Sequence, residues 1–207
     1  MKLVEMTVKD YLDVLKSDAP APGGGSVSAL SAAQGVGLVC MVADLTIGKE
    51  KYAEWQEVCI SAKEEAVDLY EKLVAAIDKD TEAFNQVSAA FKMPKETDEE
   101  KAVRKQAIAD ATLGATEVPF ETLCLCVEGL KVTEKMVGKS NPNASSDLGV
   151  AALNLLAGIK GAWLNVLINL PGVKDEEAKA RFLEGKKMVL EAEVAAARIY
   201  DDVAAAL

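Results

Sequence analysis

The sequence contains no histidine among its 207 residues. This absence excludes Ser-His-Asp and Cys-His catalysis, HExxH zinc sites and the 2-His-1-carboxylate iron site. Any acid–base chemistry must therefore come from Asp, Glu, Lys, Tyr or Cys side chains. The four cysteines (Cys40, Cys59, Cys124 and Cys126) lack the spacing of a metal site, so we interpret them as buried free thiols. We expect neither a metal nor a permanently bound cofactor.

Aromatic residues and positive charge are also scarce. Only 5% of the residues are aromatic while 50% are hydrophobic, many of them alanine, which favours closely packed helices over a β-sandwich. The net charge is −10 and there is no basic run, which argues against nucleic acid or an anionic membrane as a partner. The N-terminal segment is charged and has no hydrophobic signal region, so we expect a cytoplasmic protein with reduced thiols.

Hydrophobic periodicity predicts a single all-α domain over residues 1–207. A short helix is expected from about Thr7, and prolines and glycines then separate it from an uncharged helix over residues 27–43. Steps of three and four residues from Tyr52 to Ala90 predict a long helix whose only charged seam position is Asp80.

Further helices are expected after this long one. One begins at Thr97 with a capping box and should kink or break at Pro119. Another covers residues 148–170, and a last one follows Pro171-Gly172. The sequence therefore predicts a bundle of five to six helices.

Two of the expected helices, over residues 27–43 and 148–170, carry almost no charge. They are more apolar than one small bundle usually requires, so we expect them to be buried against a second subunit. Insertion into a membrane is disfavoured because Gln34, Lys160 and several amides interrupt the two segments.

A glycine-rich segment, Pro22-Gly23-Gly24-Gly25-Ser26, lies directly before the first uncharged helix. Exposed backbone N–H groups at a helix N-terminus suit an anion or a closely approaching ligand. The alternative is a flexible turn, since the segment matches neither a Walker A nor a dinucleotide-binding motif.

Asp80 is the most conspicuous single residue. A carboxylate in an apolar seam is costly unless it is paired or protonated. It is either a buried structural carboxylate that is capped by a partner helix, or an acid whose pKa is raised by burial and which transfers a proton near neutrality.

Other polar residues are candidates for ligand contacts. Asn141, Asn143, Ser146 and Asp147 form a polar cluster at an expected helix start, where Asp147 is alternatively a simple cap. Asn165 and Asn169 share one face of the helix that follows. Their side-chain amides either bind the donor and acceptor groups of a heterocyclic ligand or form hydrogen bonds between helices. Lys49 begins a helix and is either solvated or close to an anionic ligand.

Six motifs occur in an order that resembles the cyclodeaminase/cyclohydrolase family of folate enzymes. They cover about residues 5–205, and Ser140 departs from the glycine that is usual there. The motifs are Pro20-Ala21-Pro22-Gly23-Gly24-Gly25-Ser26, Gly48-Lys49 with Tyr52, Asp80 with Ala83-Phe84, Val118-Pro119, Asn141-x-Asn143-x-x-Ser146-Asp147, and Asn165-Val166-x-x-Asn169-Leu170.

The resemblance implies an all-helical subunit, an obligate dimer and a tetrahydrofolate derivative as the substrate. It implies a folate site lined by the glycine-rich segment, the Asp80 helix and the Asn141–Asp147 loop. Asp80, Asp147 and Lys49 are then the catalytic candidates. The substrate-binding candidates are Pro22, Gly23, Gly24, Gly25, Ser26, Asn141, Asn143, Ser146, Asn165 and Asn169.

Two reactions fit this resemblance. A chain of 207 residues has no room for a formiminotransferase domain, which favours hydrolysis of 5,10-methenyltetrahydrofolate to 10-formyltetrahydrofolate. The alternative is a formiminotetrahydrofolate cyclodeaminase, which forms 5,10-methenyltetrahydrofolate and ammonia. A non-catalytic helical oligomerisation module is the third hypothesis, and it predicts that Asp80 is replaceable without effect.

Overall fold

The computed structural model describes residues 2–207, and this part of the chain is helical with no strand. The α-helices are α1 (Val8–Leu15), α2 (Gly24–Asp44), α3 (Gln56–Phe91), α4 (Asp98–Met136), α5 (Ser145–Asn169), α6 (Glu176–Leu183) and α7 (Gly185–Ala206). The described chain also has four short 3-10 helices: η1 (Leu3–Glu5) before α1, and η2 (Glu50–Trp55), η3 (Pro142–Ala144) and η4 (Leu170–Gly172) between the later α-helices. The all-α prediction is confirmed, and the predicted last helix is divided into α6 and α7 at Glu184.

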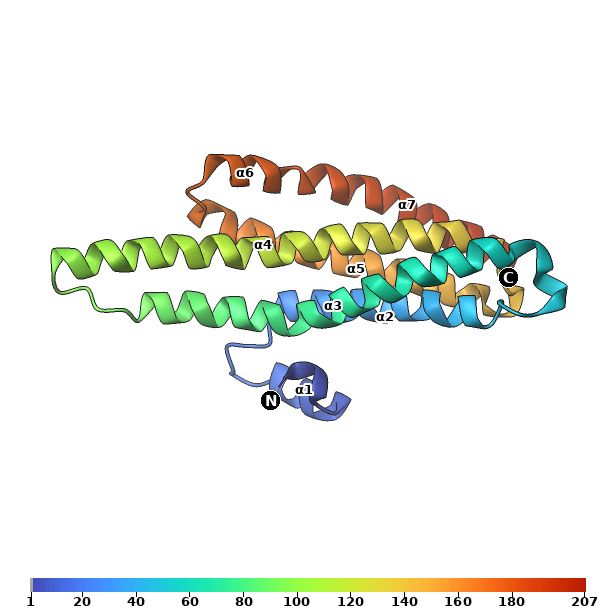
Figure 1. Ribbon diagram of the computed structural model, residues 1–207, viewed down its shortest axis with the longest axis horizontal. Coiled ribbons are helices and arrows are strands. Elements are labelled where there is room, and N and C mark those ends of the chain that lie inside the picture. The colour runs from blue at the N-terminus through green and yellow to red at the C-terminus, as the bar shows by residue number, and fades with distance from the viewer. Residues whose placement is uncertain (1) are drawn as a thin grey trace.

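The long helices lie side by side, and successive ones run in opposite directions (Figure 1). α2 packs between α3 and α5, α4 closes the bundle by contacting α3 and α5, and α7 lies along α5. The buried face of α3 follows the spacing seen in the sequence, from Cys59 through Leu69 and Leu73 to Ala83 and Ala90. This confirms the predicted apolar face from Cys59 onward and places Asp80 within the bundle, whereas Tyr52 and Trp55, its first two predicted positions, lie in η2 and not in α3.

The prediction for the start of α2 was three residues too late. The helix begins at Gly24 instead of Val27, and Gly25 and Ser26 are buried in its first turn. Gly23 has no side chain with which to cap this end. A carboxylate from α3 takes over that function, which no local sequence pattern reveals.

Of the two outcomes expected at Pro119, a kink or a break, the break does not occur, because α4 runs without interruption from Asp98 to Met136. Proline has no N–H, so the carbonyl of Ala115, one turn earlier, loses its helical donor. The side-chain Nδ2 of Asn169 donates to that carbonyl at 2.8 Å. A residue of α5 thus replaces the missing backbone bond and keeps α4 continuous.

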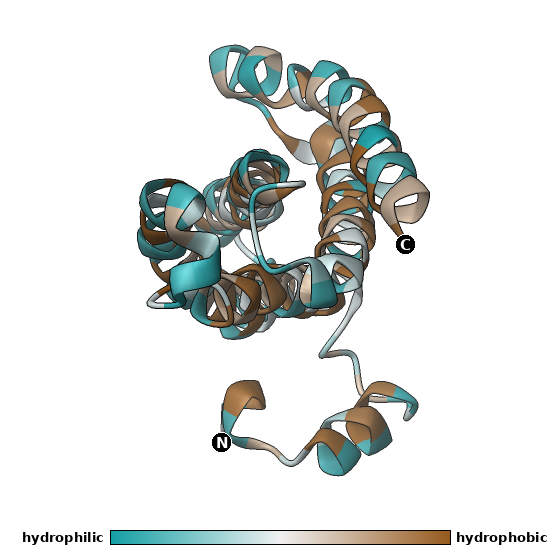
Figure 2. Cartoon of the chain, turned by 90° about the vertical axis from the view of Figure 1, so that its right-hand side faces the viewer, coloured by the Kyte–Doolittle hydropathy of each residue, from teal (hydrophilic) through white to brown (hydrophobic). Residues whose placement is uncertain are grey.

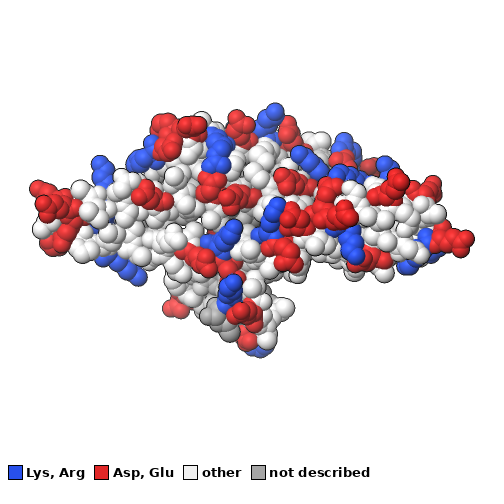
Figure 3. All heavy atoms as spheres, viewed as in Figure 1, with Lys and Arg blue, Asp and Glu red and all other residues white. Residues whose placement is uncertain are grey.

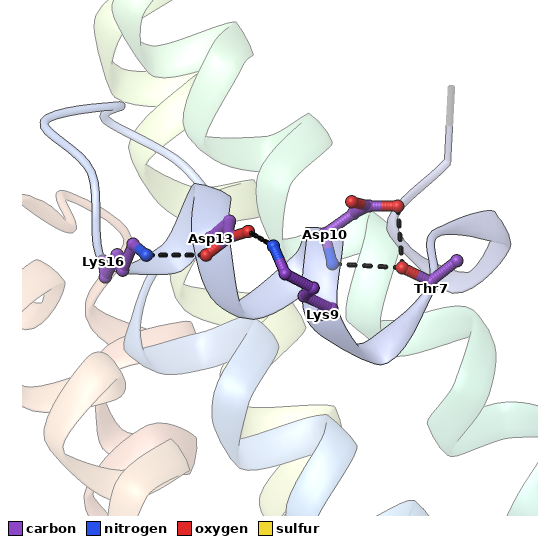
Figure 4. A network of polar contacts seen from close by, with 5 residues as sticks. All are labelled: Thr7, Lys9, Asp10, Asp13 and Lys16. Carbon is purple, nitrogen blue, oxygen red and sulfur yellow. Dashed lines mark hydrogen bonds and ion pairs between the residues drawn. The ribbon is translucent and has the colours of Figure 1, made fainter.

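α1 stands apart from the bundle, as Figures 1 and 2 show from two directions. It is stabilised locally, because the Thr7 hydroxyl caps the N–H of Asp10 at 3.1 Å and Asp13 pairs with both Lys9 and Lys16 (Figure 4). The N–H of Leu3 donates to Asp78 on α3 at 2.6 Å and anchors the segment before it.

Acidic and basic side chains are interspersed along the face of the bundle shown in Figure 3. All four cysteines are free; Cys59 and Cys126 are buried, whereas Cys40 and Cys124 are half-buried. Burial raises the pKa of all four thiols, which disfavours reactive thiolates.

Two helical stretches are long and apolar enough to cross a bilayer by length and composition. They are Gly24–Asp44 and Pro142–Gly172, and 56% and 39% of their most apolar windows are buried within the fold. Core helices of soluble proteins meet the same criterion, so this is weak evidence for a membrane span. Both helices are nevertheless incompletely covered by the rest of this chain.

Candidate functional site

A cavity of about 330 Å³ opens where the N-terminus of α2 meets α3, α4 and the C-terminal part of α5. It contains six residues singled out from the sequence: Gly23, Gly24, Gly25, Asp80, Asn165 and Asn169. The start of α2, the middle of α3, Ala115 of α4 and the end of α5 therefore meet at one place. Two of the three segments that the resemblance implies for the folate site, the glycine-rich segment and the Asp80 helix, are among them.

Asp80 lies directly on the first turn of α2. The backbone N–H of Ser26 donates to its Oδ2 at 2.8 Å, and the Ser26 hydroxyl lies 3.1 Å from the same oxygen. The carboxylate therefore caps a helix that has no cap of its own. Asp80 thus has the helix partner that the structural interpretation expects, namely the N-terminus of α2, and it also lines the cavity.

Burial raises the pKa of Asp80, and the two Ser26 contacts lower it by less. A carboxyl group with a raised pKa accepts a proton at a pH where an ordinary aspartate does not, which suits general acid–base catalysis. The negative charge of Asp80 in turn helps burial to raise the pKa of the Tyr11 phenol.

The three glycines before Ser26 differ in the space around them. A Cβ added at Gly25 would lie 1.9 Å from Oδ1 of Asp80, and one at Gly24 would lie 3.2 Å from Nδ2 of Asn165. A Cβ at Gly23 would meet no atom within 4 Å. Glycine at position 25 is therefore required for the close approach of the carboxylate, whereas Gly23 tolerates a side chain.

Pro22 and Ser26, two further candidates from the sequence, are not among the residues that line the cavity. Pro22 is buried and follows a cis peptide bond after Ala21, and Ser26 is fully buried. The first N–H groups of a helix have no intrahelical acceptor, so those of Gly24 and Gly25 are available to a ligand.

Two asparagines of α5 line the cavity, and their side-chain amides donate to different acceptors. Nδ2 of Asn165 donates to the carbonyl of Gly161 in its own helix, and Nδ2 of Asn169 donates to Ala115 on α4. The carboxamide oxygens Oδ1 of both residues are the atoms that remain for a ligand's donor groups.

Replacing Asn169 with Ala should lower stability, because the carbonyl that Pro119 leaves free on Ala115 then loses its donor. The expected cost is about 1 kcal/mol, which corresponds to a Tm lower by roughly 2–4 °C for a chain of this size. Thermal unfolding followed by circular dichroism measures it. Asn165→Ala is the matched control and should change the Tm less, since the Gly161 carbonyl keeps its helical partner; equal losses would contradict the assignment.

The remaining candidates lie at the other end of the bundle. Asn141 is 7% exposed, its Oδ1 accepts from the Tyr52 hydroxyl, and its Nδ2 donates to the carbonyl of Leu45 at 3.3 Å. It fastens η3 to the end of α2 and to η2. Asn143 and Ser146 are exposed and Asp147 is half-buried, so these three are the members of the loop that a ligand can reach.

Lys49 lies at this same end, beside the loop after α2. It is exposed, and its side chain caps no helix. Gly48 before it has a φ of 76°, in the left-handed region, which bends the chain sharply toward η2.

The two groups of candidates do not meet within one chain. Asp147 and Asn165 lie on the same helix 18 residues apart, a distance of about 27 Å along its axis. Lys49, Asn143, Ser146 and Asp147 therefore contribute nothing to the cavity at Asp80 in the same subunit. The expectation that the glycine-rich segment, the Asp80 helix and the Asn141–Asp147 loop line one site is therefore wrong for the single chain.

Phe84 and Thr81 also line the cavity, although the sequence analysis named neither as a site candidate. Phe84 is 42% exposed and lies one turn after Asp80, and Thr81 lies 3.3 Å from the Ser26 hydroxyl, oxygen to oxygen. The signal for Phe84 was present, because an aromatic residue four positions after Asp80 shares its helix face. Residues 2–207 contain no group of three or more Cys, Asp or Glu side chains that could hold a metal ion.

Comparison with known proteins points to one family. The family model described as formiminotransferase-cyclodeaminase matches residues 7–187. A methenyltetrahydrofolate cyclohydrolase from Methylorubrum extorquens is 41% identical over 198 residues, which are 95% of each chain. A formimidoyltransferase-cyclodeaminase from Gallus gallus is 35% identical over 178 residues, which are 86% of this chain and 33% of that relative.

A solved structure has the same fold. The crystal structure of formiminotetrahydrofolate cyclodeaminase from Thermotoga maritima superposes with a TM-score of 0.80 at 28% sequence identity. The match covers 98% of this chain and 96% of the other. The similarity thus extends over nearly the whole length of both chains.

Proposed function

The chain belongs to the formiminotransferase-cyclodeaminase family of enzymes, and on that premise we propose that it hydrolyses 5,10-methenyltetrahydrofolate to 10-formyltetrahydrofolate. The observation that carries this choice is the 41% identity with a stand-alone methenyltetrahydrofolate cyclohydrolase over 95% of both chains. The half-buried Asp80 in the cavity supplies the acid–base group that the reaction needs in a protein without histidine.

The first step adds water to the methenyl carbon, which carries a positive charge shared with N5 and N10. Asp80 as the carboxylate takes a proton from the attacking water, and the oxygen forms the new C–O bond. Its negative charge offsets the electropositive N-terminus of α2 and favours the cationic carbon. The product is a neutral tetrahedral adduct.

The second step opens the ring. The protonated Asp80 donates its proton to N5 while the C–N5 bond breaks, and the hydroxyl of the adduct loses its proton to solvent as the formyl C=O forms. The balance is one water consumed and one proton released for each 10-formyltetrahydrofolate. Asp80 ends each cycle as the carboxylate, ready for the next water.

The other cavity residues hold the substrate in this scheme. Phe84 offers an apolar ring to the flat pterin, and Oδ1 of Asn165 and Asn169 accept from its amino groups. The N–H groups of Gly24 and Gly25 are donors for its carbonyl. Asp147, as the residue that orients the water or binds the pterin, and Lys49, as the residue that faces the glutamate carboxylates, would reach this substrate only from a second subunit, because both lie at the other end of the bundle in the same chain.

The second candidate is the cyclodeaminase reaction, in which N10 attacks the formimino carbon and ammonia leaves. The similarity to the Gallus gallus and Thermotoga maritima proteins favours it. It requires the same proton carrier and a similar substrate, so the cavity suits both reactions. In either case the enzyme works as a cytoplasmic homodimer, without a permanently bound cofactor or metal and with no nucleic acid or membrane as a partner.

One assay separates the two reactions. The purified protein is incubated separately with 5,10-methenyltetrahydrofolate and with formiminotetrahydrofolate, and methenyl absorbance and ammonia are followed. We expect rapid loss of the methenyl absorbance and no enzymatic ammonia, both unchanged by a chelator. Ammonia release with growth of the methenyl absorbance would instead establish the cyclodeaminase, and inactivity toward both would reject the proposed function.

A further inference from the structure

Tyr11 is the one buried residue of α1, the arm that stands apart from the bundle (Figure 2). Its side chain is 7% exposed, whereas the other residues of α1 are exposed or half-buried. The ring packs with Ala29 of α2 and with Ala76 and Ile77 of α3, in a small apolar cluster separate from the main core. Tyr11 therefore seats the arm on the junction between α2 and α3.

The same junction holds Asp80. On α3, Ile77 lies one turn before Asp80, and on α2, Ala29 lies one turn after Ser26. The Ser26 hydroxyl joins the two helices, because it donates to the carbonyl of Ile77 at 2.9 Å and lies 3.1 Å from Oδ2 of Asp80. Tyr11 does not line the cavity at Asp80 but lines a separate groove of about 590 Å³ beside α1. It thus approaches the contact between Asp80 and Ser26 from the side away from the cavity.

The hydroxyl of Tyr11 is buried and has no hydrogen-bond partner among residues 2–207. A buried hydroxyl without a partner destabilises a fold, and a phenylalanine ring would fill the same apolar cluster without that cost. Packing therefore accounts for the ring of Tyr11 but not for its oxygen. Burial, and after it the charge of Asp80, raises the pKa of this phenol, so the oxygen lies within electrostatic reach of the carboxylate.

The other charged groups of this region do not compete for the Tyr11 hydroxyl. No charged side chain besides Asp80 lines the cavity, where α2 presents glycines, α4 an alanine and α5 two amides. Asp78 already accepts a backbone N–H of η1 at 2.6 Å, and Lys79 and Glu82 are exposed. The cluster around Tyr11 is apolar. Because hydroxyl dipoles orient in the field of nearby charges, we expect the O–H of Tyr11 to turn toward Asp80.

We propose that Tyr11 is a positioning residue for Asp80: its ring keeps water from the side of the carboxylate that faces away from the cavity, and its O–H is directed at the carboxylate charge. Water and substrate then reach Asp80 from the cavity alone. The ring favours the neutral acid because it excludes solvent, whereas the O–H dipole favours the carboxylate. Together they set the pH at which Asp80 takes up a proton, and the inference rests on the proposed function for the use of that proton.

Tyr11→Phe removes the hydroxyl and keeps the ring. Loss of the O–H dipole disfavours the carboxylate, so the pKa of Asp80 should rise. The carboxylate is the form that takes a proton from water, so the acidic limb of the kcat–pH profile should move to higher pH, with kcat about threefold lower on that limb and an unchanged plateau. The Tm should rise by roughly 2–4 °C, because no buried hydroxyl is left without a partner.

Tyr11→Ala should move the same limb in the opposite direction. Without the ring, water reaches the far side of Asp80 and solvates the carboxylate, and burial is the main cause of the raised pKa of this group. The pKa of Asp80 should therefore fall toward that of an ordinary aspartate, while the Tm falls because a buried ring is lost. A purely structural role of Tyr11 would change the Tm in both variants and leave the pH profile in place.

Tyr70→Phe is the matched control. Tyr70 lines the same groove as Tyr11, but it lies ten residues before Asp80 on α3, a distance of about 15 Å along the helix. Loss of its hydroxyl should leave the kcat–pH profile in place. A shift as large as that of Tyr11→Phe would contradict a specific role of the Tyr11 hydroxyl.

A titration of the Asp80 carboxyl without substrate separates this inference from the proposed function. Carbon NMR of protein labelled at the aspartate carboxyl carbons follows the resonance that Asp80→Asn removes. We expect its midpoint to move to higher pH in Tyr11→Phe and to lower pH in Tyr11→Ala. These shifts in a protein inactive toward both folates would uphold the inference and reject only the reaction. An unchanged midpoint in Tyr11→Phe would overturn the inference even if the folate reaction proved correct.

Discussion

Asp80→Asn should reduce turnover by about 10²–10⁴-fold, the usual contribution of a positioned general acid–base group. The amide keeps the shape of the carboxylate, and its oxygen still accepts from the N–H of Ser26, but it takes no proton from water at neutral pH. The measurement is kcat with 5,10-methenyltetrahydrofolate, together with far-ultraviolet circular dichroism. Activity within about threefold of wild type would remove Asp80 from the chemistry, and collapsed helicity would make it a purely structural residue.

The same variant has a defined effect on stability. Because the folded protein raises the pKa of Asp80, the ionised carboxylate costs stability, and this cost appears as the pH rises above the pKa of an ordinary aspartate. Below that pKa the wild type carries the neutral acid and resembles the amide. The Tm of Asp80→Asn relative to wild type should therefore increase from acidic to neutral pH; a constant difference would show that the pKa of Asp80 is not raised.

Gly25→Ala should have the second large effect. Its Cβ would lie 1.9 Å from Oδ1 of Asp80, a distance that no relaxation of the alanine itself relieves. Either the carboxylate or the first turn of α2 has to move, and in both cases the proton carrier leaves its place and α2 loses its cap. We expect kcat/KM to fall by at least about 10²-fold, since a displacement of about 1 Å already has an effect of that size.

Gly23→Ala provides the control for this comparison. The added methyl group meets no atom within 4 Å, and the backbone there is extended, so the variant should keep kcat/KM within about twofold and an unchanged Tm. Each of the two variants replaces one glycine of the same segment, and they differ in whether the added methyl group lies close to Asp80. Similar losses in both variants would mean that the segment needs flexibility instead of space.

The long-range periodicity of the sequence was sufficient to predict the bundle. The spacing from Cys59 to Ala90 identified the buried face of α3 and showed Asp80 as the charged residue within it. The buried face depends on helix geometry, which the order of residues encodes directly. The glycine-rich segment and the two asparagines of α5, named as substrate-binding candidates from the family resemblance, lie at one cavity, and their role stays a prediction.

Other features depend on contacts between distant residues and were not predictable. The continuity of α4 through Pro119 depends on Asn169, 50 positions later, and the early start of α2 depends on Asp80. The sequence indicates that Asn141 is a ligand-binding amide, yet its side chain is hydrogen-bonded to the Tyr52 hydroxyl and to the carbonyl of Leu45. The separation of the two ends of α5 was equally hidden, because order along the sequence carries no information on which loops share an end of the bundle.

The contact between Asp80 and the N–H of Ser26 links the chemistry to the main chain. If the carboxylate takes up and releases one proton in every turnover, the hydrogen bond that starts α2 alternates between a charge-assisted and a neutral one. The hydrogen bond that holds the first turn of α2 then weakens and strengthens once in each turnover, and Gly24 and Gly25 lie in the turn that this affects. Each turnover would thus change the stability of the same backbone segment that binds the substrate.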